Sequence, residues 1–305
     1  MADLTCELGS LKLKNPVMTA SGTFGYGMEY HQYYDIAKLG AVVVKGIATF
    51  ESHGNPTPRV AEVHSGMLNA IGLQGPGIDK FLHDPHYMPF LRTTNATVIV
   101  NIWGKTIEQY QEVAARLDAD SQGIAALEIN ISCPNVKEGA IAFGQKADAL
   151  YDITSQIKKV AAQPVIMKLS PNVTDITEMA KAAEAAGADA LSMINTITGM
   201  KIDIHRRKFA LANKTGGMSG PAIKPVAVRM VYQTAQAVKI PIIGMGGIAN
   251  AEDAIEFLLA GATAVSIGAM NFINPYTTVE TVQGIEDYMR KYQITDIKEL
   301  IGAVQ

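Results

Sequence analysis

The sequence predicts an α/β protein whose eight parallel strands close into a TIM, or (β/α)8, barrel. Eight short apolar runs rich in Val, Ile and Ala alternate with helical stretches along the 305 residues. Strands that are covered by helices on both faces have this continuous apolar character, and eight such units suffice for a closed barrel. The eight runs span residues 17–22, 41–46, 97–104, 126–133, 165–171, 190–196, 241–246 and 264–269.

The remaining elements follow in chain order. Residues 3–15 predict a short N-terminal hairpin that turns at Gly9 and Ser10 and plugs the bottom of the barrel. Two connections, 47–96 and 197–221, are far longer than ordinary βα loops and predict lids or walls of a site. Helices are expected to begin after Tyr26 and Asp79 and near Thr106, Lys146, Asp175, Ala222, Ala251 and Thr278, with Asn250 as a cap and Gly261 as a terminator.

Composition narrows the class of function. A net charge of −3 provides no global attraction to a phosphate backbone, so nucleic acid is not expected as a partner. The first residues lack the features of a signal peptide, and no apolar stretch approaches the roughly 18 residues of a membrane span. We expect one cytoplasmic domain over residues 1–305, without a disulfide between the two cysteines, and with Cys6 in the core.

Reactive and polar residues gather where the apolar runs end. Cys133 closes the fourth run, a position at which barrels carry catalytic groups, although a lone cysteine is more often an inert core residue. Lys45 and Lys168 interrupt apolar runs, so each requires an anionic partner unless it extends to solvent. Amide side chains stand at or just beyond the C-terminal end of apolar runs, and they are Asn69, Asn101, Asn130 and Asn195.

The last two runs predict a phosphate site. Gly246 and Gly247 follow the seventh run, and Gly268 and Ala269 follow the eighth, where barrels commonly bind phosphate. Residues 244–249 also match a dinucleotide fingerprint, but no acidic residue follows at the distance that a ribose contact requires. The barrel phosphate site is the better interpretation.

Four segments together resemble the class 1 dihydroorotate dehydrogenases, and the similarity extends nearly end to end. They are 69–74 (NAIGLQ), 130–135 (NISCPN), 165–171 (VIMKLSP) and 216–222 (GGMSGPA). The resemblance implies an FMN-containing TIM barrel that oxidises (S)-dihydroorotate to orotate in pyrimidine (UMP) synthesis. Class 1 members use cysteine as the base, which implies this role for Cys133. The reaction removes a proton from C5 and a hydride from C6, so the base faces one carbon and flavin N5 the other.

The resemblance also implies the residues of the site. Lys168 would lie at the N1–C2 carbonyl side of the flavin, and Lys45 would contact flavin and substrate. The implied FMN contacts are Ser21, Lys45, Gly46, Asn101, Asn130, Lys168, Ile194, Gly220, Gly246, Gly247, Gly268 and Ala269, with Gly22 nearby. The implied substrate contacts are Lys45, Asn69, Ala70, Ile71, Gly72, Leu73, Asn130, Asn135, Asn195 and Thr196. No metal is expected, because the histidines of residues 83–86 lack a third ligand nearby.

The electron acceptor is implied by residues 54–60 (GNPTPRV) and 70–74 (AIGLQ), which resemble the NAD-linked type B, although residues 74–77 (QGPG) lack the Asn that many members place before the proline. Two cysteines are too few for an iron–sulfur cluster. By resemblance, a homodimer of this chain binds electron-transfer subunits that carry FAD and a [2Fe–2S] cluster, which gives a heterotetramer. A fumarate-using type A enzyme and a redox-silent phosphate-binding barrel are the alternatives.

Overall fold

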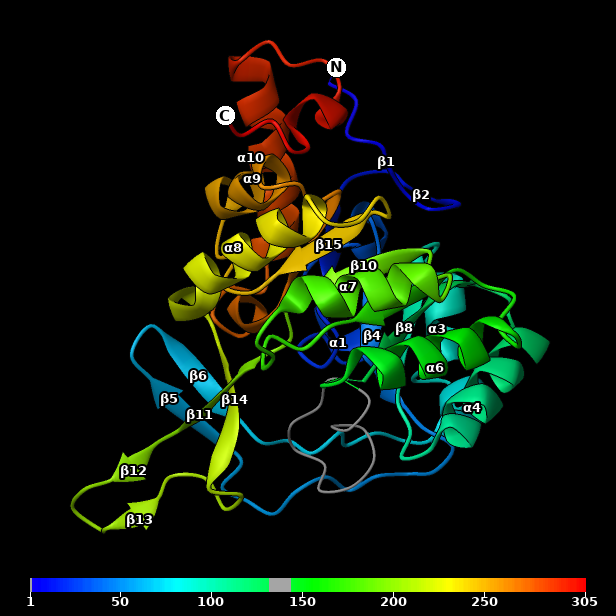
Figure 1. The fold of residues 1–305 in the computed structure, drawn as a ribbon, viewed down its shortest axis with the longest axis vertical. Helices are drawn as coiled ribbons and strands as arrows, with labels where there is room; N and C mark the ends of the chain where they lie inside the picture. Colours follow the sequence, from blue (N-terminus) through cyan, green and yellow to red (C-terminus); the bar gives the residue numbers. More distant parts are fainter. Residues whose placement is uncertain (1, 132–143) are drawn as a thin grey trace.

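The computed structural model describes residues 2–131 and 144–305 and contains a sheet of eight parallel strands (Figure 1). Neighbours in the sheet follow chain order, and the first strand pairs with the last. The strands are β3 (Val17–Thr19), β4 (Val42–Ile47), β7 (Val98–Ile102), β8 (Ile124–Asn130), β9 (Val165–Lys168), β10 (Ala190–Met193), β15 (Ile242–Met245) and β16 (Ala264–Ile267).

Thr19 closes the sheet into a barrel. A parallel bridge joins Met18 to Ala41, and the Thr19 amide donates to the Ala41 carbonyl at 3.3 Å. The Thr19 hydroxyl, which is fully buried, accepts a hydrogen bond from the Val43 amide at 2.9 Å. A side chain therefore replaces one rung of the ladder between β3 and β4. The predicted eight-stranded barrel is confirmed.

Replacing Thr19 by Val is expected to lower the free energy of unfolding by about 1–3 kcal/mol, because the buried Val43 amide loses its acceptor. Urea denaturation followed by circular dichroism measures this change. Thr198→Val is the matched control, because Thr198 is exposed in the strand Ile197–Met200. We expect it to change the free energy of unfolding little. Equal stability of the two variants would show that the Thr19 hydroxyl contributes nothing to closure.

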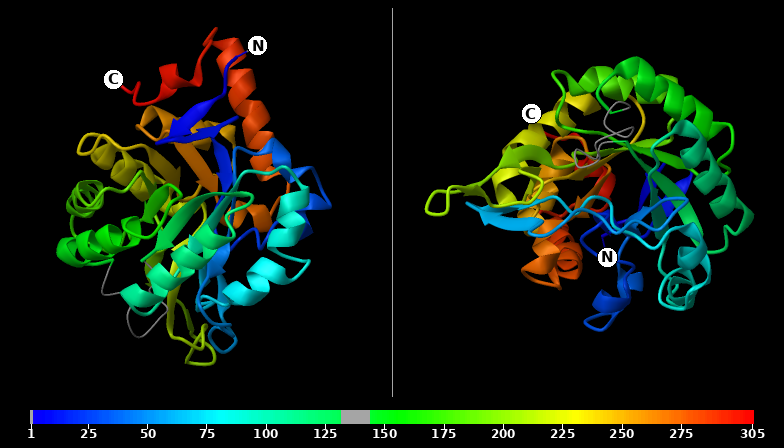
Figure 2. Two further views of the ribbon diagram at one scale, coloured as in Figure 1. Left: turned by 90° about the vertical axis from the view of Figure 1, so that its right-hand side faces the viewer. Right: turned by 90° about the horizontal axis from the view of Figure 1, so that it is seen from below.

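In the described part of the chain, six helices of at least nine residues pack around the outside of the barrel (Figures 1 and 2). Three begin near predicted starts and have side-chain caps, because Thr106, Asp175 and Asn250 accept from backbone amides of the first turn. Of these, Asn250 was predicted as a cap. Gly261 follows the end of its helix at φ +111°, as predicted. The helices are α4 (Ile107–Ala119), α6 (Ala147–Lys158), α7 (Ile176–Ala185), α8 (Lys224–Ala235), α9 (Ala251–Leu259) and α10 (Thr277–Lys291).

The structure also contains shorter helical segments. They include the helix that was expected after Tyr26 and a 3-10 turn that precedes α8. The helix that was expected after Asp79 begins one residue earlier than that, at Ile78. None of the described helices is both long and apolar enough to cross a membrane. The segments are α1 (Met28–His31), η1 (Ile36–Lys38), α2 (Ile78–His83), α3 (Met88–Thr93), η2 (Pro221–Ile223), η3 (Ala269–Phe272) and η4 (Ile297–Leu300).

The N-terminal hairpin forms as predicted. Strands β1 (Cys6–Leu8) and β2 (Leu11–Leu13) pair antiparallel and turn at Gly9, whose φ is +62°. Gly9 lies close to Asp189, the residue that precedes β10, so the hairpin packs at the end of the barrel where the strands begin.

Cys6 is a free thiol in this hairpin, and it is 1% exposed. Burial raises the pKa of the Cys6 thiol to about 12, so only about one thiol in 10⁴ is ionised at pH 8. We expect a Cys133→Ala variant, in which Cys6 is the remaining cysteine, to resist labelling by a disulfide reagent until urea unfolds it. Rapid labelling of this native variant would contradict the assignment of Cys6 to the core.

The two long insertions pair with each other. Their strands β5 (Val60–Val63), β6 (Gly66–Asn69), β11 (Ile197–Met200) and β14 (Thr215–Ser219) form an antiparallel sheet in the order β11-β14-β6-β5. A hairpin of β12 (Ile202–Asp203) and β13 (Lys208–Phe209) extends from it, far from both termini (Figures 1 and 2). The insertions thus form a wall at the end of the barrel opposite the N-terminal hairpin.

Candidate active site

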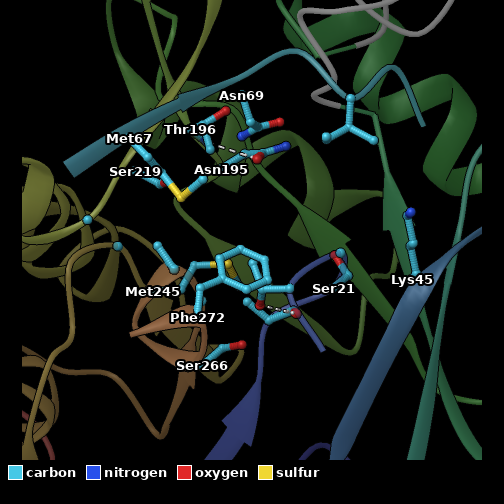
Figure 3. Close-up of a pocket in the computed structure, with 18 of the residues that line it drawn as sticks. Ser21, Lys45, Met67, Asn69, Asn195, Thr196, Ser219, Met245, Ser266 and Phe272 are labelled. Carbon is cyan, nitrogen blue, oxygen red and sulfur yellow. Dashed lines mark hydrogen bonds between the residues drawn. The ribbon is translucent and has the colours of Figure 1, made fainter. Parts of the chain in front are cut away.

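A cavity of about 350 Å³ lies at the C-terminal ends of the barrel strands (Figure 3). Each of the eight strands contributes at least one lining residue, either from the strand or from the residues that follow it. The observed strands are mostly shorter than the predicted runs, and residues that follow the strands, such as Ser21, Ile194 and Thr196, line the cavity. The insertions add a further wall.

Most of the predicted site residues meet in this cavity. All twelve expected FMN contacts line it, and so does Gly22. Among the expected substrate contacts, Ala70 is absent from the lining, because its side chain packs in a small cluster with Leu68 and Leu211. Cys133 and Asn135 lie outside the described residues. The expected substrate contacts that line the cavity are Lys45, Asn69, Ile71, Gly72, Leu73, Asn130, Asn195 and Thr196.

The amide side chains form a polar corner at one side of the cavity. Asn195 and Thr196 follow β10, and Asn69 ends β6 of the insertion sheet. The Asn195 Oδ1 accepts from the Thr196 amide at 2.8 Å, and the three side chains lie together in Figure 3. Amides that both donate and accept can match the alternating N–H and C=O groups of a planar cyclic ligand.

Lys168 lies at the base of the cavity and pairs with Glu128. The Lys168 Nζ is 3.3 Å from Glu128 Oε1 and 3.0 Å from Ser21 Oγ, and both charged side chains are almost fully buried. The sequence predicted an anionic partner for this lysine, but our sequence analysis did not identify Glu128. Glu128 is two residues before Asn130 in one strand, so both side chains point to the same face. The two-residue spacing from Asn130 was therefore the feature of the sequence that could have indicated a carboxylate inside the barrel.

Lys45 faces the cavity without such a partner. No ion pair joins it to any residue that the structure describes, although it is partly buried in β4. Burial, and after it the charge of Arg59, holds the pKa of Lys45 below its ordinary value. Both effects disfavour an uncompensated ammonium, so an anionic ligand in the cavity would relieve them. This is the electrostatic condition for binding a carboxylate or phosphate.

The glycines after β15 form a tight turn at another side of the cavity. Gly246 and Gly247 have φ of +125° and +80°, and a Cβ on Gly247 would lie 2.9 Å from the carbonyl oxygen of Gly220. The turn leads into α9, whose N-terminus carries a partial positive charge. Close backbone approach and a helix N-terminus together suit a phosphate group, as the sequence predicted.

Several further residues line the cavity that sequence reasoning did not identify. Ser266 is the most informative, because its buried hydroxyl has no hydrogen-bond partner in the part of the chain that the structure describes. Ser266 precedes Gly268 by two positions, and this spacing from a predicted phosphate-site residue was the feature of the sequence that could have identified it. The other lining residues include Arg59, Met67, Ser219, Met245 and Phe272, most of which Figure 3 labels.

No metal site accompanies this cavity in residues 2–131 and 144–305, where no three His, Cys, Asp or Glu side chains gather in a suitable arrangement. His86, which the sequence raised as a weak metal candidate, contacts Asp84 at 2.7 Å on an exposed loop. The polar groups of the cavity are instead lysines, amides and hydroxyls, which suit an organic anion.

Comparison with known proteins gives one consistent result. The dihydroorotate dehydrogenase family model matches residues 3–289. The chain is 62% identical over 298 residues to the "Dihydroorotate dehydrogenase B (NAD(+)), catalytic subunit" of Lachnoclostridium phytofermentans, with 98% of each chain covered. Proteins of the same name from Geotalea uraniireducens and Alkaliphilus metalliredigens are each 56% identical, with 99% of this chain and 98% and 99% of theirs covered.

Proposed function

This chain belongs to the dihydroorotate dehydrogenase family, and on that premise we propose that it is the catalytic subunit of an NAD-linked enzyme that oxidises (S)-dihydroorotate to orotate in pyrimidine biosynthesis. The observation that carries the proposal is the cavity itself. It combines a glycine turn, a cluster of amides and two lysines at the strand ends of one barrel. The whole chain then acts as one FMN-binding domain in the cytoplasm.

The residues of the cavity fit FMN. Gly246, Gly247, Gly268 and Ala269 would hold the phosphate, since the first two take backbone conformations that favour glycine. The unpartnered Ser266 hydroxyl is available to a ligand atom. Lys168 would face the N1–C2 carbonyl side of the flavin. When bound, FMN supplies the hydride acceptor. Ser21, Gly46, Asn101, Ile194 and Gly220 complete the proposed contacts.

The remaining lining residues would bind the substrate. Lys45 provides the positive charge for an anionic substrate. Burial, and after it the charge of Arg59, lowers its pKa, and a bound anion would oppose both effects. Asn69, Asn130, Asn195 and Thr196 would hydrogen-bond the ring, and residues 71–73 would close over it. Cys133 would take the proton from C5.

Electrons must leave the chain for NAD. The relatives are named catalytic subunits, which implies a second subunit. We propose that this partner carries FAD and a [2Fe–2S] cluster, and that two copies of each chain form a heterotetramer. The two cysteines of this chain are too few to hold such a cluster.

The test is the visible spectrum of the anaerobic purified chain before and after addition of dihydroorotate, followed by either NAD or fumarate. We expect a yellow flavin spectrum that dihydroorotate bleaches and that neither acceptor restores efficiently until the partner subunit is added with NAD. Recovery with fumarate alone would indicate the type A enzyme. Colourless protein that takes up no FMN would favour a redox-silent phosphate-binding barrel.

A further inference from the structure

Glu128 lies beneath the cavity and does not line it. Its side chain is 2% exposed, and its partners come from the two adjacent strands, β7 and β9, and from β10, the strand beyond β9. Oε1 accepts from Asn101 Nδ2 at 2.6 Å and from Lys168 Nζ at 3.3 Å, and Oε2 accepts from Ser192 Oγ at 2.8 Å. A buried carboxylate with this many hydrogen-bond partners is held in one position by the barrel.

Lys168 lies between this carboxylate and the cavity. Its Nζ also donates to Ser21 Oγ at 3.0 Å, and both Lys168 and Ser21 line the cavity. Glu128 therefore holds the ammonium from the barrel interior, on the side away from a ligand. It also offsets the lysine charge, because two opposite charges at this separation in a buried site act on a ligand as a dipole and not as a full positive charge.

We propose that Glu128 is a positioning residue that sets the charge which Lys168 presents to the flavin, and thereby sets the relative affinity of the site for oxidised and reduced FMN. The inference rests on the proposed function. Reduced flavin carries more negative charge on its pyrimidine ring than oxidised flavin does. Removing the Glu128 charge leaves Lys168 uncompensated, which favours the reduced form.

The test is the midpoint potential of FMN bound to the whole chain, measured by spectral equilibration with a reference dye. In Glu128→Gln, the amide oxygen can still accept from Lys168 and Asn101, and the amide nitrogen can donate to the Ser192 hydroxyl. We expect reduced FMN to gain at least tenfold in affinity relative to oxidised FMN, which is a shift of about 30 mV to more positive potential for a two-electron couple.

Two controls separate charge from structure. Glu128→Asp keeps the charge, and Ser192→Ala removes one hydrogen bond without changing any charge. In both variants, we expect the ratio of the affinities for reduced and oxidised FMN to stay within about threefold of that of the unmodified chain, which is about 15 mV. If Glu128 had only a structural role, its replacement would weaken the binding of oxidised and reduced FMN equally and leave the midpoint potential unchanged. If Glu128→Gln does not fold, Glu128→Met is the second variant without the charge, and it should show the same positive shift.

The outcomes distinguish this inference from the function on which it rests. An unchanged or more negative potential in a folded, FMN-loaded Glu128→Gln or Glu128→Met chain overturns the role of Glu128 and leaves the dehydrogenase intact. Failure of both variants to fold would also overturn it, because Glu128 would then be a structural residue. If the unmodified chain binds no FMN, the proposed function itself fails.

Discussion

Replacing Lys168 by Met is expected to lower the free energy of unfolding by about 3–5 kcal/mol, because the change leaves Glu128 as a buried carboxylate without its counter-charge. The retained hydrogen bonds from Asn101 and Ser192 satisfy the oxygens of Glu128 but provide no positive charge. Urea denaturation of the FMN-free chain measures the loss. The variant should also bind FMN weakly and show little bleaching by dihydroorotate.

The double variant Lys168→Met/Glu128→Gln is the matched control. It removes both charges, and replacing a whole buried ion pair by neutral groups costs far less than breaking it. We expect it to regain most of the lost stability while the reaction with dihydroorotate stays impaired. A double variant as unstable as Lys168→Met would show that the lysine stabilises the fold by packing and not by its charge.

Replacing Cys133 by Ala is expected to slow the reduction of bound FMN by dihydroorotate by about 10²–10⁴-fold, the usual contribution of a general base. Thiolate is the basic form, and an ordinary thiol ionises with a pKa of about 8.5, so the rate for the unmodified chain should rise with pH toward that value. The rise should disappear in the variant. Anaerobic stopped-flow absorbance across pH 6–9 measures both effects.

Cys6→Ala provides the control, because it removes the only other cysteine of the sequence, which lies in the N-terminal hairpin. Its thiol is buried and its pKa is raised to about 12, so it is not available as a base at neutral pH. We expect this variant to lose stability and to keep its reduction rate. A Cys133→Ala chain that retains FMN and the full rate of reduction would exclude Cys133 as the base.

The amino-acid sequence by itself determined the barrel and the end at which its site forms. Hydrophobic runs have a local signature, since a strand covered on both faces is apolar throughout its length. Parallel strands end at the same edge, so residues such as Lys45, Asn101 and Lys168, which stand near the C-terminal ends of three apolar runs, had to approach one another. The helix starts at Thr106, Asp175 and Asn250 also depend on neighbouring residues alone, because a capping side chain accepts from backbone amides in the first turn of the helix that it begins.

Only the tertiary structure decided which of these groups interact. Glu128 and Lys168 are 40 positions apart, and no local pattern states that the carboxylate in one strand meets the ammonium in the next. The same holds for closure of the barrel by Thr19 and for the pairing of Asn69 with Gly217 across the two insertions. These contacts depend on strand register and on side-chain direction across the barrel. Periodicity fixes which face a residue occupies, whereas packing of the whole chain fixes its partner.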